Sequence, residues 1–407
     1  MMQIVARHSA AVQAEILNRE LSSAEVRQSH LLGNPTFDAT WGTIPLGETN
    51  PPQLGSPLSR VPNYGLGISY TFPLGKRDPR QQRAAALEES ARANVTATAR
   101  AQALDLARIL GAAAVAALRV EGLGGLVAQE RGSIALAQSR LSGGFGTPLD
   151  VDRLMIELSR TEQQVLDNEG DMREALTTCA SLLGQRCEAF ATSDEARAFL
   201  TAWVKRAEAI ERGPLAMEAR PDVRSLDASR RAAIAEADFA SAQAIPDPTL
   251  RLGYVYDQFV ASGNQAHSLN VSVALPLPLF DRGQAQKDAA EARRRRFGTQ
   301  RDRIVEVAKV RISVLRDLLG LRERRQEVIV MEMLPRAKTV VNDLEKAAAT
   351  RLIPLTDVIQ ARRTLSELLV QEAESYGEAF QVAVNLIEES PMGSADVDPR
   401  AGRAVSP

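Results

Sequence analysis

Apolar and polar residues alternate strictly in two neighbouring segments, residues 249–257 and 267–275. The apolar positions are Leu250, Leu252, Tyr254, Tyr256, Leu269, Val271, Val273 and Leu275. A period of two predicts β-strands with one apolar face, and the polar turn at 261–264 joins them as an antiparallel hairpin. At about ten residues each, they match the length of a transmembrane β-strand.

A second pair of strand-like segments, residues 36–44 and 64–72, lies in the first half of the chain. The tripeptide Asn34-Pro35-Thr36 opens the first of them, and Asp247-Pro248-Thr249 opens the later hairpin 213 residues further on. Recurrence of the same local order predicts a structural repeat, with loops of different length in its two copies.

Long helical patterns follow the strands in both halves. We predict a first repeat over 1–205 with a helical hairpin at 80–183 and a short equatorial segment after it. A second repeat over 206–390 has its hairpin at 284–389, and the polar tail 391–407 is expected to be disordered. The fold class is therefore mainly α, with four β-strands.

Coiled-coil spacing runs along both long helices. The first seam consists of small and apolar residues that step by four and three: Leu106, Leu110, Ala113, Ala117, Val120, Gly124 and Val127. In the second, Val307, Val314, Leu321 and Val328 recur every seven residues. Such spacing is typical of helices that pack side by side, and Pro335 is expected to kink the second hairpin.

Aromatic residues are only 4% of the chain, yet they gather around the predicted strands. This crowding is typical of the aromatic girdles of membrane barrels, which we assign to Phe37, Trp41, Tyr70, Phe72, Tyr254 and Tyr256. The net charge of −2 argues against a nucleic-acid partner, because neutralising phosphates needs a cationic surplus. The basic run Arg293–Arg296 is read as a solvated helix face.

The sequence offers no enzyme signature. No spaced Ser/His/Asp set or phosphate loop is present, and the three histidines are far apart, so we expect no catalysis, no cofactor and no metal site. Cys179 and Cys187 flank the Gly184 that should end a helix. In an oxidising compartment they can form a disulfide, but two unrelated thiols fit the spacing equally well.

Four strands with one apolar face cannot close a barrel alone, since the smallest single-chain membrane barrels use eight. An open sheet edge is not tolerated in lipid, so the strands must share a barrel with copies of the same chain. Three copies give a twelve-stranded barrel continued by helical hairpins; physical reasoning alone leaves two or four copies open.

The order of these elements resembles the TolC-type outer membrane channels of tripartite efflux pumps and type I secretion systems. The resemblance covers residues 1–390 and includes LPLPLFDRG after the last strand and PRAKTVVNDLEKAAATRLIPLTDVIQARRTL across the second hairpin tip. It implies a homotrimer in outer membrane lipid, with a twelve-stranded barrel and a periplasmic α-helical tunnel. It also implies a passive exit duct docked to a periplasmic adaptor and an inner-membrane pump, for which LPLPLFDRGQ favours the resistance-nodulation-division class.

The resemblance also indicates a gate at the periplasmic helix tips. Asp357 matches the first of two acidic positions that ring the family's pore, while Gln360 stands at the second, so the ring is weaker. Asp150 and Asp152 are the candidates at the first tip. Asp150 fits helix capping equally well, and Asp357 also fits a first-turn acid that favours the helix dipole.

A different class of protein, a periplasmic adaptor with one coiled-coil hairpin and a small β domain, is the alternative. Two hairpins of each kind argue against it. Met1 is followed directly by an amphipathic helix, with no basic region, apolar core or cleavage site of a signal peptide. Because family members cross the inner membrane, we expect the true start to lie upstream or the signal to have been removed.

Overall fold

The computed structural model describes residues 1–42, 63–144, 146–210, 215–257, 265–349 and 355–391. The chain forms two compact units, each built from segments of both halves. The first unit comprises residues 1–17, 92–225 and 300 onward, and the second comprises residues 18–91 and 226–299. No helix in the described part of the chain is both long and apolar enough to cross a membrane.

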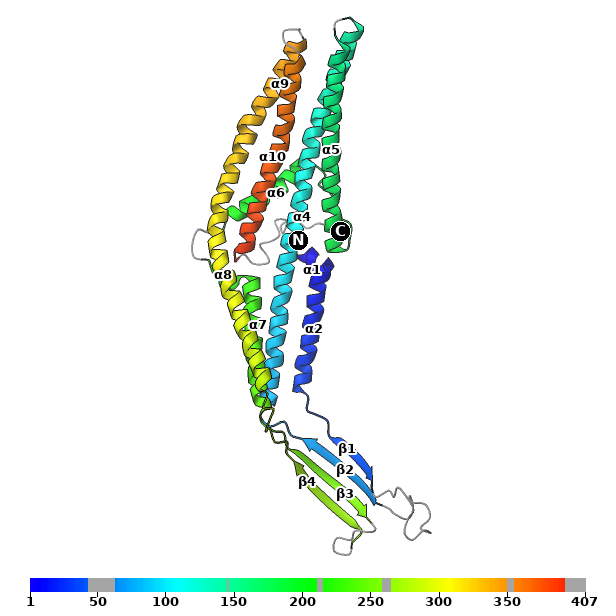
Figure 1. Cartoon of the computed structure of the whole chain (residues 1–407), viewed down its shortest axis with the longest axis vertical. Coiled ribbons are helices and arrows are strands. Elements are labelled where there is room, and N and C mark those ends of the chain that lie inside the picture. Colours follow the sequence, from blue (N-terminus) through cyan, green and yellow to red (C-terminus); the bar gives the residue numbers. More distant parts are fainter. Residues whose placement is uncertain (43–62, 145, 211–214, 258–264, 350–354, 392–407) are drawn as a thin grey trace, which may run out of the picture. The chain divides into compact units, whose positions relative to one another are not determined.

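The elements occur twice in the same order (Figure 1). The first series is α1 (Met2–His8), α2 (Ala10–His30), β1 (Thr36–Trp41), β2 (Asn63–Thr71), α4 (Arg77–Ser142), α5 (Pro148–Leu183) and α6 (Ser193–Glu208). The second, after a 3-10 turn η1 (Met217–Ala219), is α7 (Pro221–Gln243), β3 (Thr249–Asp257), β4 (His267–Ala274), α8 (Gln284–Glu327), a π-helical segment η2 (Val328–Met333), α9 (Leu334–Ala349) and α10 (Leu355–Glu389). Long antiparallel hairpins therefore follow both strand pairs.

The core of the first unit forms where α4, α6 and α10 meet. Trp203 of α6 is fully buried, and its ring lies 6.0 Å from that of Phe380 of α10 in an edge-on contact. A Cβ at Gly111 of α4 would lie 2.1 Å from the Phe380 ring, so only glycine lets α4 approach this closely. Gly111 lies beside the predicted first seam, whose Ala113 is fully buried, whereas a Cβ at the seam residue Gly124 would meet nothing within 4 Å.

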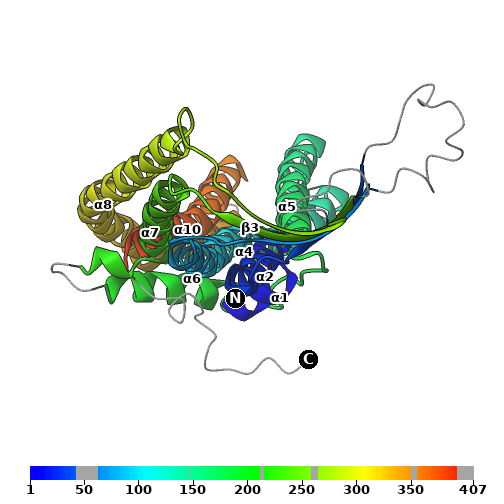
Figure 2. The same ribbon diagram turned by 90° about the horizontal axis from the view of Figure 1, so that it is seen from below.

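The second unit contains a single antiparallel sheet with the strand order β1-β2-β3-β4. Both hairpins belong to this one sheet, because β2 pairs with β3 along nine residues. Seen from below, the strands form one thin curved layer (Figure 2). Within the described residues the sheet leaves both outer strands, β1 and β4, unpaired along their outer edges.

Two sequence expectations differ from the structure. The expected first helix is broken at Ser9, whose extended backbone separates α1 from α2 and whose hydroxyl donates to Gln102 Oε1 at 3.1 Å. Strand β1 ends at Trp41, earlier than predicted, and residues 43 and 44 lie outside the described residues. Where a kink was expected, the π-helical segment ends two residues before Pro335, whose missing N–H and bulky ring are incompatible with a regular helical turn.

Candidate channel surfaces

One face of the sheet is apolar across all four strands. Residues directly opposite in an antiparallel sheet point to the same side, so the register defines rows. The central row is Phe37, Ile68, Leu252 and Val271, and the next is Ala39, Leu66, Tyr254 and Leu269. Nearly all the large members of these rows are exposed in the chain. An exposed apolar face of this extent requires a non-aqueous neighbour.

Aromatic residues stand at both ends of this apolar face. At one end Trp41, Tyr64, Tyr256 and His267 form a row, and the hydroxyl of Tyr254 lies 2.6 Å from His267 Nδ1. At the other end the Tyr70 and Phe72 rings meet edge-on at 4.8 Å. From Tyr64 to Phe72 the strand extends for about 27 Å, which on a tilted strand is close to the apolar thickness of an outer membrane barrel.

Most of the predicted girdle residues lie near these ends, whereas Phe37 lies in the central row. Sequence reasoning did not assign His267, whose place opposite Tyr256 becomes visible only from the strand register. Phe280, an aromatic residue beside the strands that the six assigned girdle positions do not include, is 92% exposed in the segment that follows β4. The role of all these residues as a girdle stays a prediction.

The opposite face of the sheet carries small and polar side chains. Its rows are Thr36, Ser69, Arg251 and Ser272, then Asp38, Gly67, Gly253 and Asn270, then Thr40, Gly65, Val255 and Ser268. The sheet therefore separates lipid-compatible from water-compatible surface, as the wall of a water-filled barrel does.

The four predicted gate residues lie in the first turns of α5 and α10. Thr147 caps α5: its Oγ1 accepts from the Asp150 amide at 3.2 Å and donates to Asp150 Oδ2 at 2.7 Å. This is the capping geometry that was the alternative for Asp150. Asp152, Asp357 and Gln360 are exposed. No described contact within the chain joins these residues, and their role at a pore stays a prediction.

Between the tips and the core of the first unit, ion pairs join the two helical hairpins. Arg363 of α10 makes a two-bond salt bridge with Glu157 of α5, and this hydrogen bond lowers the pKa of Glu157. Arg119 of α4 pairs with Glu374 of α10 at 3.0 Å. The sequence did not indicate these residues. Charged residues that pair with another helix cannot be distinguished from solvent-exposed ones until the opposing helix is known.

A polar cavity of about 30 Å³, large enough for one or two water molecules, lies beside the Arg363–Glu157 bridge. Glu130 of α4 reaches it and is 4% exposed; burial raises the pKa of its carboxyl group, although the hydroxyl of Thr161 donates to it at 3.2 Å. Water in this cavity would complete the hydrogen bonding of Glu130. The contact between the hairpins is therefore partly polar.

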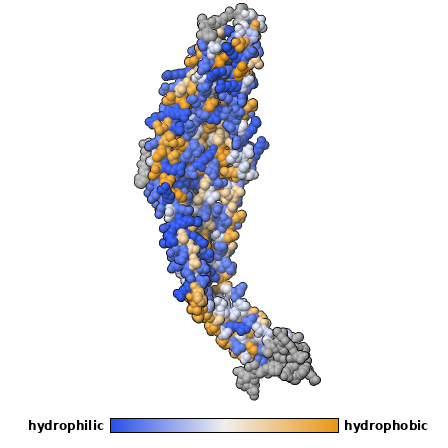
Figure 3. Space-filling view, in the orientation of Figure 1, coloured by the Kyte–Doolittle hydropathy of each residue, from blue (hydrophilic) through white to orange (hydrophobic). Residues whose placement is uncertain are grey.

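The heptad that was expected to form a seam on α8 is largely uncovered within the chain, and of its four members only Val307 is half-buried. Val314 is 59% exposed, and Val310, Leu321, Val328 and Met331 are exposed along the same stripe. The helix instead buries Val305, Ala308, Ile312, Leu315 and Leu319. Figure 3 shows hydrophobic residues between polar ones along the surface of the helices. Helix α8 thus has two apolar stripes and covers only one of them inside the chain.

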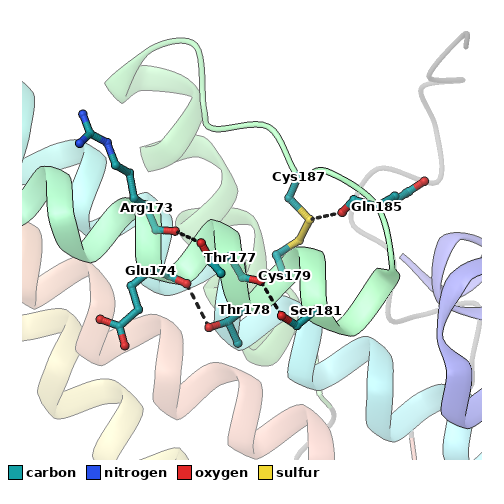
Figure 4. Close-up of a disulfide and its surroundings, with 8 residues drawn as sticks. All are labelled: Arg173, Glu174, Thr177, Thr178, Cys179, Ser181, Gln185 and Cys187. Carbon is teal, nitrogen blue, oxygen red and sulfur yellow. Dashed lines mark hydrogen bonds between the residues drawn. A yellow bond between two sulfur atoms is a disulfide. The ribbon is translucent and has the colours of Figure 1, made fainter.

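Cys179, near the end of α5, is bonded to Cys187 in the segment that follows, with Cα atoms 6.1 Å apart (Figure 4). Gly184 ends α5 in the left-handed conformation at φ 63°, which reverses the chain and brings the two cysteines together. Cys179 is buried against the core, so the disulfide holds residues 184–187 against the first unit.

The double variant Cys179→Ser with Cys187→Ser is expected to be about 2–3 kcal/mol less stable, because the short crosslinked loop gains conformational entropy in the unfolded state. Thermal unfolding of the purified protein in detergent measures the effect, and the same protein treated with a reductant is the control. Equal unfolding temperatures for the oxidised, reduced and serine forms would contradict a stabilising role.

Comparisons with known proteins address the architecture. No family model matches the chain. The outer membrane protein VceC of Vibrio cholerae superposes with a TM-score of 0.70 at 18% identity over 96% of this chain and 95% of its own. CusC gives a TM-score of 0.71 at 16% identity over 97% and 91% of the two chains, and the Campylobacter jejuni CmeC outer membrane channel gives 0.72 at 11% over 95% and 84%.

The chain has the fold of the outer membrane efflux channels. The resemblance inferred from the order of the sequence elements is thereby confirmed. In sequence, the chain is 25% identical over 285 residues to the cobalt-zinc-cadmium resistance protein CzcC of Cupriavidus metallidurans. The match covers 64% of this chain and spans 63% of the length of CzcC.

Proposed function

We propose that this protein is the exit channel of an efflux or type I secretion system, placed in the bacterial outer membrane with a periplasmic extension. The observation that carries the proposal is the sheet, which is apolar on one face, polar on the other and, in the part of the chain that the structure describes, open along both outer strands. In lipid, open edges must be paired. Pairing β4 of one copy with β1 of the next satisfies both edges and extends the wall into a barrel.

Three copies are the number that we propose for this assembly. They give twelve strands, within the range that encloses a lumen, and they match the trimeric family that the sequence resembles. The uncovered stripe of α8 supports the same assembly, since a heptad of exposed valines and leucines packs best against a helix of another copy. The helical hairpins of the copies then continue the barrel as an α-helical tube.

The partners follow from the same proposal. A passive duct needs a pump in the inner membrane and an adaptor between the two, and the two helical hairpin tips are the docking surface. A pump of the resistance-nodulation-division class is supported by the LPLPLFDRGQ segment and by the similarity to CzcC, a protein named for metal resistance.

The adaptor alternative finds no support in the sheet. An adaptor's β domain would bury its apolar face in a core of its own, whereas here the central row of the sheet stays exposed. Purified protein reconstituted into planar bilayers tests the proposed function. Discrete conducting steps, and a trimeric mass in detergent, are the expected results; a monomer that stays soluble without detergent and never conducts would exclude the duct.

For the gate, Asp357→Ala is expected to weaken block by divalent and trivalent cations added from the helix-tip side by about tenfold, because a ring of three carboxylates concentrates cations. Gln360→Ala, one turn further along the same exposed face of α10, is the uncharged control. Added cations should block it as strongly as they block the wild type. Unchanged conductance and block in Asp357→Ala would remove Asp357 from the constriction.

A further inference from the structure

In the middle of the polar face of the sheet, an acid and a base face each other across β2. Arg251 of β3 donates from Nε to Asp38 Oδ1 of β1 at 3.2 Å, and its Nη2 bonds Oδ2. A guanidinium that meets a carboxylate through two parallel bonds is held in direction as well as in position. The two charges therefore neutralise each other at a fixed place on the wall.

Gly67 of β2 makes this pairing possible. A Cβ at this position would lie 2.8 Å from Asp38 Oδ1 and 2.9 Å from Arg251 Nε, so any side chain would displace the pair. The neighbouring row position on β3, Gly253, is also a glycine. The salt bridge thus lies flat over bare backbone instead of standing out from the sheet.

Asp38 and Arg251 hold equivalent positions in the two repeats. They are 213 residues apart, which is the offset between Thr36 and Thr249 at the starts of β1 and β3. Asp38 lies opposite Gly67, and Arg251 lies opposite Ser272, so Ser272 holds in the second repeat the place of Gly67. The repeat therefore places opposite charges at matching sites.

In a barrel of three copies, the repeat would place these charges in a ring around the lumen. Its six equivalent inward sites would carry acid and base in alternation, all at one level. On the Gly67 side Arg251 has room to reach Asp38 of its own copy, whereas on the other side the Ser272 side chain fills the gap. The ring would then consist of three closed pairs with no net charge.

We propose that Asp38 and Arg251 set the charge of the lumen at their own level of the barrel, and that their pairing leaves this level without preference for cations or anions. The inference rests on the proposed function, since only a closed barrel turns this face into a lumen. At this level the wall is neutral and passes cargo of either sign, whereas Asp257 at the end of β3 adds a carboxylate to the same face at another level.

Single-channel recording with the blocker added from the barrel side tests this. Hexaamminecobalt(III) is the cationic probe and citrate the anionic one. Arg251→Gln leaves three unpaired carboxylates, so hexaamminecobalt(III) should block at a concentration about tenfold lower than in the wild type. Asp38→Asn leaves three guanidinium groups and should show the converse, with citrate as the stronger blocker. The double variant D38R/R251D restores pairing and should behave like the wild type.

The outcomes separate this inference from the proposed function. Channels that conduct in the wild type but show the same block in Arg251→Gln, Asp38→Asn and the double variant would overturn the neutral pair and leave the duct intact. A wild-type protein that forms no channels would overturn both. If one of the single variants fails to assemble, the other still tests the inference, because Arg251→Gln should be blocked more strongly by the cation and Asp38→Asn by the anion.

Discussion

Arg220→Met is expected to cost about 3–5 kcal/mol of folding free energy, because it removes one partner from a buried ion network. The Arg220 side chain is only 5% exposed and that of Glu389 only 8%. Arg220 donates from Nη1 to the Glu389 carbonyl at 2.7 Å and to Glu389 Oε2 at 3.1 Å. It also holds Asp222 through two bonds, at 3.0 and 2.7 Å.

The network matters because it terminates α10. The last carbonyls of a helix have no partner within it and carry partial negative charge. A second buried arginine, Arg100 of α4, donates to the carbonyls of Ile387, Glu388 and Ser390 at 2.8, 3.2 and 2.9 Å. Arg100 and Arg220 thus fix the end of α10 to α4 and to the start of α7.

The matched control is Arg311→Met. Arg311 also pairs with Glu389, at 2.5 Å, but its side chain is 54% exposed, so its loss should cost less than about 1 kcal/mol. Denaturant unfolding of the full chain in detergent measures both variants. Similar losses for Arg220→Met and Arg311→Met would contradict the account of a buried clamp.

The loss of stability caused by Arg220→Met should depend on pH. Burial raises the pKa of Asp222, but the hydrogen bond and charge of Arg220 outweigh it, so the pKa lies below its usual value. A lowered folded-state pKa contributes stability above the unfolded-state pKa and loses it as the pH falls. The difference in unfolding free energy between the wild type and Arg220→Met should therefore become smaller below about pH 4, where Asp222 becomes protonated in the unfolded chain.

Leu252→Arg should impair insertion into lipid more than any change on the opposite face. Leu252 lies in the central apolar row, and an arginine on the lipid side of a barrel near the midplane costs about 2–4 kcal/mol per copy. Asn270→Arg adds the same side chain to the polar face and should insert normally.

Folding into vesicles, followed by protease protection and by the shift of the trimer on gels, measures both variants. Equal insertion of Leu252→Arg and Asn270→Arg would contradict the assignment of faces. Loss of insertion confined to Asn270→Arg would reverse the assignment.

The sequence predicted the strands and long helices well because their patterns are local. Period-two alternation in residues 249–257 is visible without knowing the partner strand, and β3 has these bounds. The resemblance to efflux channels depended on the order of such elements, and this order survives where identity to known structures falls below 20%.

What the sequence did not show depends on partners far away in the chain. Arg220 and Glu389 are 169 residues apart, and nothing near either residue marks it as buried. The break at Ser9 likewise depends on Gln102 of another helix. Asp38 and Arg251 became a pair only once the register placed Gly67 between them. Local pattern therefore predicts elements, and tertiary contacts determine which charges work together.

Crosslinking between copies tests the central claim most directly, namely that β4 of one copy pairs with β1 of the next. The pairing of Gly67 with Gly253, carried over by the repeat, places Ser272 opposite Thr40 of the neighbouring copy. Oxidation of a variant with Thr40→Cys and Ser272→Cys in the outer membrane should give covalent dimers and trimers. Thr36→Cys with Ser69→Cys, which pair within one chain, should stay monomeric. Monomers alone from the first pair would contradict the shared barrel.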